Sequence, residues 1–313
     1  MNANLPVSVS LTVAGLLLVG FAFYLGFRLG SGRRWAALIG SLGLVAAAPL
    51  LVPSEARFAR FLVALAAVVV GMKLWDAHIG ARRAVKAPFR SYVGFLLNPT
   101  ALVWRRLPYE RRPSRRQSGT GFAVAVLGTL LMTVLLVMIG HVRWDTQPFL
   151  VEHVAKAAVV FLLFTAVMDV MVHALRIAGG VARDFTDAPW IARTPGEFWR
   201  RYNRSIGQFI EDDVFKPLCH CVPTRLAIVV AFLVSGLLHE YAFAISVGRV
   251  EGYATLFFVT QGIAVAASSG LKARGWSELP AVAATLVFLI GSSILLFAAV
   301  DGVVRFYSRG APV

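Results

Sequence analysis

Long apolar runs separated by short polar segments dominate the chain. The runs cover residues 7–27, 36–52, 58–75, 120–140, 154–175, 226–247, 252–270 and 279–300. They approach or reach the length that a membrane-spanning helix needs, and they lack the strict alternation of transmembrane barrel strands. The pattern predicts an all-α polytopic membrane protein with about eight transmembrane helices.

A further apolar stretch, FRSYVGFLLNPTALVW at 89–104, is interrupted at Asn98-Pro99. A proline disfavours the helical conformation in the residue before it, so we predict a re-entrant or interfacial helix that breaks there. Near the end of the third run, Lys73 and Asp76 stand three residues apart. This spacing predicts an ion pair at the helix terminus.

The amino-acid composition also distinguishes a membrane protein from a water-soluble one. The chain is 58% hydrophobic and 15% charged, with a mean hydropathy of +0.72. A water-soluble globule is about half apolar and about a quarter charged, so that class is excluded. The first run lacks a basic leader and is too long for a signal-peptide core, so no cleavable signal peptide is expected. We predict one membrane domain over residues 1–313.

The net charge of +15 follows membrane topology rather than a nucleic-acid surface. Most of the 31 lysine and arginine residues fall in the segments 28–34, 82–116, 176–225 and 272–274. The positive-inside rule therefore predicts that the large basic loops are cytosolic and that both termini lie outside. The stretch RRLPYERRPSRR at 105–116 suits contact with anionic lipid headgroups. It also suits attraction of a phosphate-bearing substrate such as coenzyme A.

An amphipathic helix is predicted after Thr194. Thr194 can serve as the N-cap, Pro195 fits the first helical position, and Glu197 completes a capping box. Wound as one helix, residues 198–214 gather their apolar side chains on one side. Asn203 and Asp213 fall inside that apolar arc. A buried amide needs partners, so Asn203 is a candidate functional residue.

The apolar run 226–247 holds His239 and Glu240 in its interior. Ionisable groups at such depth are costly and mark a candidate functional site. From Leu226 to His239 is roughly 20 Å of helix at the standard rise. We therefore expect His239 near mid-membrane, where a substrate reaches it through a cavity.

Two motifs carry a family resemblance. They read FWRRYN at 198–203 and VSGLLHE at 234–240, with APWIARTPGEFW at 188–199, DVFKP at 213–217 and HEYAF at 239–243 beside them. Through these residues the chain resembles the membrane-bound O-acyltransferase (MBOAT) superfamily, and within it the wax synthase-like branch. The resemblance is specific over 185–245. Tyr202 departs from it, because the family usually has Trp there, and a Gly often found between the Phe-Trp and Arg-Arg pairs of plant wax synthases is absent.

The resemblance implies acyl transfer from acyl-CoA to the hydroxyl of a lipophilic alcohol. His239 would take the alcohol proton as general base, and Asn203 would donate to the developing oxyanion or orient the donor. The resemblance brings in no cofactor beyond acyl-CoA as co-substrate. Substrate binding or support is expected from further residues of the two motifs: Trp199, Arg200, Arg201, Tyr202, Asp213, Ser235 and Glu240.

Several side chains keep alternatives open. Ser235 and His239 share a helical face at i, i+4 spacing, so Ser235 is a minority candidate for a covalent nucleophile. Asp213 would cap a turn, or pair with Lys216 or a neighbouring span. Glu240 would pair with an arginine of the cytosolic helix or reach along a cavity. Asp169 with His173 would form a polar patch at a span end or a second wall of the reaction chamber.

A non-enzymatic alternative also stays open: a transporter or lipid-binding protein with a path along its intramembrane polar residues. The inverted repeats and paired broken helices of many carriers are missing from the sequence. The two cysteines, Cys219 and Cys221, flank one histidine too closely for a zinc clip. We therefore predict neither a metal site nor a disulfide.

Overall fold

The computed structural model describes residues 4–28, 31–82, 88–109, 113–271 and 278–310. Within these ranges the regular structure is helical throughout, which confirms the all-α class. The long helices are α1 (Leu5–Phe23), α2 (Ser31–Ala47), α3 (Arg57–Arg82), α5 (Arg115–Gly140), α6 (Phe149–Ile177), α10 (Thr224–Val247) and α12 (Glu278–Val303).

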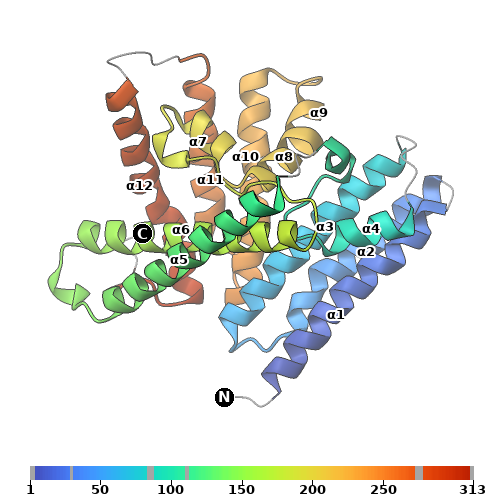
Figure 1. Ribbon diagram of the computed structural model, residues 1–313, viewed down its shortest axis with the longest axis horizontal. Coiled ribbons are helices and arrows are strands. Elements are labelled where there is room, and N and C mark those ends of the chain that lie inside the picture. The colour runs from blue at the N-terminus through green and yellow to red at the C-terminus, as the bar shows by residue number, and fades with distance from the viewer. Residues whose placement is uncertain (1–3, 29–30, 83–87, 110–112, 272–277, 311–313) are drawn as a thin grey trace.

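Seven helical stretches in the described part of the chain are long and apolar enough to cross a membrane. They coincide with seven of the eight predicted runs, so the protein is a polytopic membrane protein. The eighth run, 252–270, forms the shorter α11 (Tyr253–Ala267) of 15 residues. At the standard rise that is about 22 Å, less than a typical hydrocarbon core. In Figure 1 α11 nevertheless returns antiparallel beside α10.

The N-terminal helices form one bundle with the interrupted segment. α1, α2 and α3 pack around Leu16, Leu38 and Leu74. The segment predicted as a re-entrant or interfacial helix forms α4 (Phe89–Leu97), and its break at Asn98-Pro99 is confirmed, because the helix ends at Leu97. Its Tyr92 is buried and donates a hydrogen bond to the Gly20 carbonyl at 2.6 Å. The segment is therefore anchored against α1.

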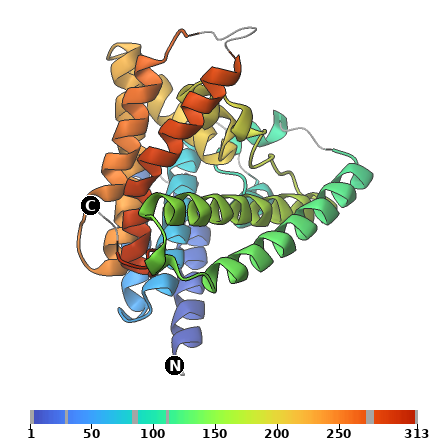
Figure 2. The same ribbon diagram turned by 90° about the vertical axis from the view of Figure 1, so that its left-hand side faces the viewer.

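The helices α5 and α6 form a hairpin that runs transversely to α10 and α12 in both views (Figures 1 and 2). The inner helix of the pair, α6, packs against the motif region through the rings of Phe161 and Phe164. The outer helix α5 leaves most of its apolar surface exposed. Of the residues in its most apolar 18-residue stretch, 6% are buried. The hairpin thus supplies one wall of the motif region from α6 alone.

The approach of α10 to α11 depends on two glycines. A Cβ on Gly236 would lie 3.0 Å from the Thr255 Cα and 3.1 Å from the Phe258 Cβ. A Cβ on Gly262 would lie 2.8 Å from the Phe232 Cβ. The bare glycines let the two backbones come close, as small residues do in membrane helix pairs. This packing brings Phe258 of α11 to the face of α10 that carries His239.

The predicted continuous helix over 198–214 is wrong in its middle. The segment forms α7 (Pro195–Arg201), α8 (Arg204–Phe209), a π-helical turn η6 (Ile210–Phe215) and α9 (Lys216–Leu218). The break falls at Asn203, whose φ of 44° is left-handed, a conformation that asparagine tolerates better than most residues. The predicted N-cap is confirmed, because the Thr194 hydroxyl accepts the Glu197 N–H at 3.1 Å. The predicted capping box is wrong, because the Glu197 carboxylate accepts from the Arg193 N–H and from the side chains of Arg193 and Arg201 instead.

Candidate active site

His239 lies half-buried on α10, and its hydrogen bond fixes its tautomer. The ring Nδ1 lies 2.8 Å from the Ser235 carbonyl oxygen. A carbonyl can only accept, so Nδ1 carries the proton and Nε2 keeps its lone pair. Among the described residues, no hydrogen bond to Nε2 is formed. The nitrogen that can act as a base is therefore the one directed away from its own helix.

Ser235 contributes its backbone to this arrangement. Its carbonyl oxygen accepts from Nδ1, and its side chain is buried on α10. A serine nucleophile needs an unprotonated nitrogen of its base within hydrogen-bond reach. The histidine nitrogen on the Ser235 side already carries its proton, so this geometry does not favour the covalent route.

An aromatic bridge connects His239 to the FWRRYN motif. The His239 ring lies on Phe258 with centroids 4.3 Å apart. Phe258 in turn contacts the Trp199 ring at 5.7 Å. Trp199 is therefore separated from the histidine by one phenyl ring, although the two motifs are far apart in sequence.

Trp199 is held by a residue that the sequence analysis missed. Its indole Nε1 donates to the Gln261 Oε1 at 3.2 Å, and the Gln261 Nε2 donates to the Ser292 hydroxyl at 2.7 Å. Gln261 is fully buried. A glutamine inside an otherwise apolar run was a usable signal, since a buried amide needs partners on both its oxygen and its nitrogen.

Asn203 ends α7 and starts α8. It is half-buried, and its Oδ1 accepts from the Ile206 N–H at 3.5 Å as an N-cap. The next residue is held from another segment, because the Arg204 N–H donates to the Phe185 carbonyl at 3.0 Å. Only the amide oxygen is used in the cap. Within the described part of the chain, the Nδ2 group of Asn203 donates no hydrogen bond, so this donor is available.

Tyr202 completes an apolar stack beside Asn203. Its ring packs on Phe198 at 5.4 Å and on Phe161 of α6 at 5.1 Å. Burial raises the pKa of the Tyr202 phenol well above its ordinary value, so the ring stays neutral. At this position tyrosine serves as a packing aromatic, which is what the tryptophan usual in the family would also provide.

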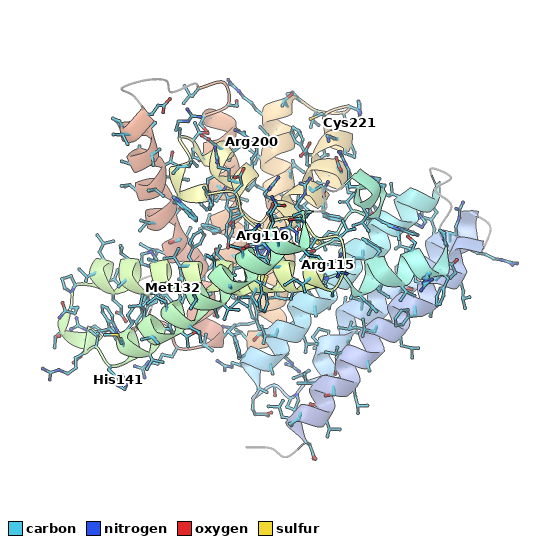
Figure 3. All side chains as sticks on the ribbon, in the orientation of Figure 1. Arg115, Arg116, Met132, His141, Arg200 and Cys221 are labelled. Atoms are coloured by element: carbon cyan, nitrogen blue, oxygen red, sulfur yellow. The ribbon has the colours of Figure 1, made fainter. Side chains whose placement is uncertain are left out.

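The two motif arginines have different surroundings. Arg201 donates to Glu197 at 2.9 Å and to the Asp187 carbonyl at 3.0 Å, so it stabilises α7 internally. Arg200 is exposed and lies at the upper end of the molecule, the end at which Cys221 also lies (Figure 3). Of the pair, Arg200 is the one that faces outward.

Among the described residues, Glu240 forms no ion pair with an arginine and instead accepts hydrogen bonds at the start of α11, so the expected arginine pair is wrong. Its Oε1 accepts the Gly252 N–H at 2.6 Å and the Glu251 N–H at 3.1 Å, and its Oε2 accepts the Thr255 N–H at 3.1 Å. The carboxylate thus caps the first turn of α11, where free N–H groups and the helix dipole favour an anion. Glu240 fixes α11, and hence Phe258, against His239.

The predicted pair between Lys73 and Asp76 is also wrong. Asp76 binds Arg105 at 2.7 Å and accepts the Trp104 N–H at 2.6 Å, whereas Lys73 binds backbone carbonyls. Arg105 also pairs with Asp213, which is buried as the helical wheel predicted. The partner of Asp213 is therefore an arginine of the first basic segment, rather than Lys216.

Next to this buried pair lies a cavity of about 360 Å³ on the same side as α9. Its lining residues are Arg105, Arg106, Asp212, Lys216, Pro217 and His220. Asp212 pairs with Arg106 at 2.8 Å and with Lys216 at 2.7 Å. Burial acts to raise the pKa of this carboxyl, but the hydrogen bonds from Arg106 and Lys216 hold it below its ordinary value. Neither Asn203 nor His239 lines this cavity.

Among the described residues, Asp169 and His173 of α6 form no salt bridge with Arg176 of the same helix. Arg176 binds Asp184 at 2.7 Å and the Ala182 carbonyl at 2.8 Å, both in the loop after α6. The His173 Nδ1 is buried without a hydrogen-bond partner among the described residues, and the ring faces Gly121 of α5. The expectation of a second chamber wall at Asp169 and His173 stays a prediction.

Comparison with known proteins covers the segment that holds both motifs. The profile of the "Membrane bound O-acyl transferase family" matches residues 181–260. This range contains Asn203 and His239, together with Trp199 and Phe258, whose ring lies between Trp199 and His239. Over this segment the chain is similar to the membrane-bound O-acyltransferase family. The superfamily resemblance seen in the sequence is thereby confirmed, and the wax synthase-like branch stays a prediction.

Three plant enzymes are similar to this chain. Diacylglycerol O-acyltransferase 1A of Glycine max is 27% identical over 175 residues, which is 50% of this chain and 34% of the soybean protein. Diacylglycerol O-acyltransferase 1 of Arabidopsis thaliana is 33% identical over 64 residues, 20% of this chain and 12% of that protein. Diacylglycerol O-acyltransferase 1-1 of Oryza sativa subsp. japonica is 26% identical over 93 residues, 29% of this chain and 17% of that protein.

The similarity therefore spans about a third or less of each relative's length. Within the part of the chain that the structure describes, no group of three His, Cys, Asp or Glu side chains is arranged to hold a metal. Cys219 and Cys221 are both exposed and free.

Proposed function

We propose that this protein is a membrane O-acyltransferase that moves a fatty acyl group from acyl-CoA to the hydroxyl of a lipophilic alcohol, in the manner of wax synthases. The observation that carries the proposal is the tautomer of His239. An imidazole with Nδ1 bound to the Ser235 carbonyl presents Nε2 as a base, beside an aromatic wall from the family motif.

In the proposed reaction, Nε2 of His239 accepts the hydroxyl proton as the alcohol oxygen attacks the thioester carbonyl carbon. The carbonyl oxygen becomes an oxyanion, and the Nδ2 of Asn203 donates to it. The C–S bond then breaks. The leaving thiolate takes the proton back from Nε2, so the products are the ester and the CoA thiol.

The surroundings of His239 suit this chemistry. From Thr224, where α10 begins, to His239 is about 22 Å of helix at the standard rise, and the ring packs on Phe258. A site walled by Phe258, Trp199 and Tyr202 excludes bulk water. Exclusion of water strengthens the hydrogen bond to an oxyanion and protects the thioester from hydrolysis. The ester product would enter the bilayer directly.

For the donor, the proposal places the phosphates of coenzyme A at the cavity beside α9. The side chains of Arg106 and Lys216 there are 44% and 47% exposed, so their remaining donors can reach a phosphate. The exposed Arg200 adds positive charge on the same side. The first basic segment would thus serve both the topology and the attraction of the donor.

For the acceptor, the relatives supply a second candidate. All three are named diacylglycerol O-acyltransferases, whereas the motifs resemble wax synthases. A fatty alcohol and a diacylglycerol both offer a hydroxyl to the same base. Purified protein assayed with each alcohol, with the ester identified by mass spectrometry, separates the two.

The test of the activity is CoA thiol release by detergent-purified protein given acyl-CoA and a mixture of alcohols. His239→Ala is expected to lower the rate about 10²–10⁴-fold, the usual contribution of a general base. His141→Ala is the matched control, because His141 is exposed at the far end of the α5–α6 hairpin (Figure 3). A rate unchanged by His239→Ala would show that the assignment of the base is wrong.

The same assay addresses the transporter or lipid-binding alternative. A protein that only moves or holds lipid releases no thiol above the rate without protein. Transfer that requires His239 excludes this alternative as the main function. Binding of acyl-CoA without any thiol release, over a full set of alcohols, would favour it.

A further inference from the structure

Lys73 is a buried cation in the spanning helix α3. It is 1% exposed. Its Nζ donates to the backbone carbonyls of Phe95 at 2.7 Å, Leu96 at 3.2 Å and Asn98 at 2.5 Å. Among the described residues it forms no salt bridge. A lysine inside a span is costly and marks a function by default, and the proposed reaction does not use this one.

The three carbonyls account for the three N–H groups of the ammonium. They belong to the last turn of α4 and the residue after it, where carbonyls have no partner inside the helix and the dipole favours a cation. A neutral side chain of similar length would leave these carbonyls unpaired inside the protein. Lys73 therefore fixes where α4 ends and where Asn98 begins the next segment.

Hydrogen bonds of Asn98 connect the end of α4 to the motif region. Its Nδ2 donates to the Val181 carbonyl at 2.5 Å, and its Oδ1 accepts from the Thr100 N–H at 3.0 Å and hydroxyl at 2.8 Å. The Thr100 carbonyl then accepts from the Ser205 hydroxyl at 2.7 Å. Both Thr100 and Ser205 are buried.

Ser205 lies in the first turn of α8, the turn that Asn203 caps. Asn203 has the left-handed φ of 44°, which holds only when the neighbouring backbone is fixed. The hydrogen bond from Ser205 to Thr100 fixes that backbone from the side of α3 and α4. An unbroken series of hydrogen bonds thus leads from Lys73 through Asn98 and Thr100 to the turn that carries Asn203.

We infer that Lys73 is a positioning residue for acyl transfer: it holds Asn203 in place through Asn98, Thr100 and Ser205. The inference rests on the proposed function, since it assigns Lys73 an effect on the step that Asn203 assists. It predicts an effect on the chemical step rather than on donor binding, because none of Lys73, Asn98, Thr100 and Ser205 lines the cavity beside α9.

The chain offers a matched control in Lys156. Its Nζ binds Glu152 at 2.6 Å and the Phe306 carbonyl at 2.5 Å, so it too is a well-bonded lysine on a spanning helix. Lys156 contacts Phe306 of the C-terminal segment rather than the motif region. Lys156→Met therefore tests the cost of losing such a lysine without any link to Asn203.

The experiment is a double-mutant cycle on kcat for CoA thiol release, with Lys73→Met, Asn203→Ala and both together. Lys73→Met alone is expected to lower kcat about 10-fold or more with a small change in the KM for acyl-CoA. In the Asn203→Ala background it is expected to lower kcat no further, because residues that act through one another are not additive. Lys156→Met is expected to leave kcat within about 2-fold of the wild type.

Additive losses in the cycle, or equal losses for Lys73→Met and Lys156→Met, would overturn the inference and leave the proposed function intact. A wild-type protein without thiol release would instead overturn the proposed function. If Lys73→Met does not yield folded protein, Ser205→Ala provides the same cycle, because it removes the hydrogen bond to Thr100 and leaves the ammonium in place. Additivity of Ser205→Ala with Asn203→Ala would equally contradict the inference.

Discussion

At the scale of single residues, the two ring nitrogens of His239 have different roles. The Nδ1 of His239 is occupied by the Ser235 carbonyl of its own helix, which leaves Nε2 for the substrate. The neighbouring Glu240 never approaches this ring as a buttress. It acts on the partner helix, by capping α11 and so holding Phe258 against the imidazole.

Glu240→Gln is expected to lower stability by about 1–3 kcal/mol, because an amide nitrogen cannot accept and one buried N–H of the α11 cap loses its partner. The measurement is thermal unfolding in detergent, together with thiol release. Glu251→Gln is the control, since the Glu251 carboxylate pairs with Arg249, which is 74% exposed, and exposed ion pairs contribute about 0–1 kcal/mol. Equal effects of the two substitutions would contradict the capping role.

At the scale of elements, the close approach of α10 to α11 and the short helices α7 and α8 determine the geometry of the candidate active site. The pair α10–α11 depends on Gly236 and Gly262. The segment α7–α8 depends on a turn at Asn203 and on the ion pairs of Glu197 with Arg193 and Arg201. Neither arrangement follows from hydropathy, since each depends on contacts of particular residues with segments that are distant in sequence or on a single turn.

Gly236→Ala is expected to destabilise the protein by about 1–3 kcal/mol, as overpacking does, and to lower acyl transfer. The reason is that the added methyl meets the backbone of Thr255 at 3.0 Å and must move α11 together with Phe258. Gly291→Ala on α12 is the control, because a Cβ there has nothing within 4 Å. The check is the unfolding midpoint and the rate of each variant. An unshifted midpoint in Gly236→Ala would argue against the close contact.

The stability of α7 is expected to depend on acid pH through Glu197. Desolvation by burial acts to raise the pKa of Glu197, but the backbone N–H and side chain of Arg193 and the side chain of Arg201 lower it to about 2. A lowered pKa stabilises the fold at pH values above the ordinary value of about 4.5, and this contribution is lost as pH falls toward 2. The difference in melting temperature between wild type and Glu197→Gln should therefore be full at pH 6 and shrink between pH 4.5 and pH 2. A difference in melting temperature that stays constant from pH 6 to pH 2 would contradict this role of Glu197.

At the scale of the whole molecule, the basic segments are part of the tertiary structure. Arg105 and Arg106 of the first segment meet Asp213 and Asp212 of the second. Their charges thus join the two large loops that the positive-inside rule assigns to the cytosol. A topology signal and a structural contact are carried by the same side chains.

The proposed orientation has natural reporters. The chain has 2 cysteines, and both are exposed and free at the end where α9 lies. With the large loops cytosolic, a membrane-impermeant maleimide should leave intact cells unlabelled and label the protein nearly completely after permeabilisation. The variant Cys219→Ser/Cys221→Ser should not be labelled in either case. Labelling of intact cells would show that the large loops face outward and would contradict the proposed orientation.

The sequence by itself determined the all-α membrane class, the long apolar helices, the N-cap at Thr194 and the two motifs that carry the family resemblance. These properties are local: hydropathy, helix capping and short motifs need only neighbouring residues. The tertiary structure decided the partners of Lys73, Asp76, Asp213 and Glu240, the break at Asn203, and the nitrogen of His239 that is free to accept a proton. Such outcomes depend on which distant elements meet, because a buried charge or amide takes its nearest available partner in space, and spacing along a helix does not reveal that partner.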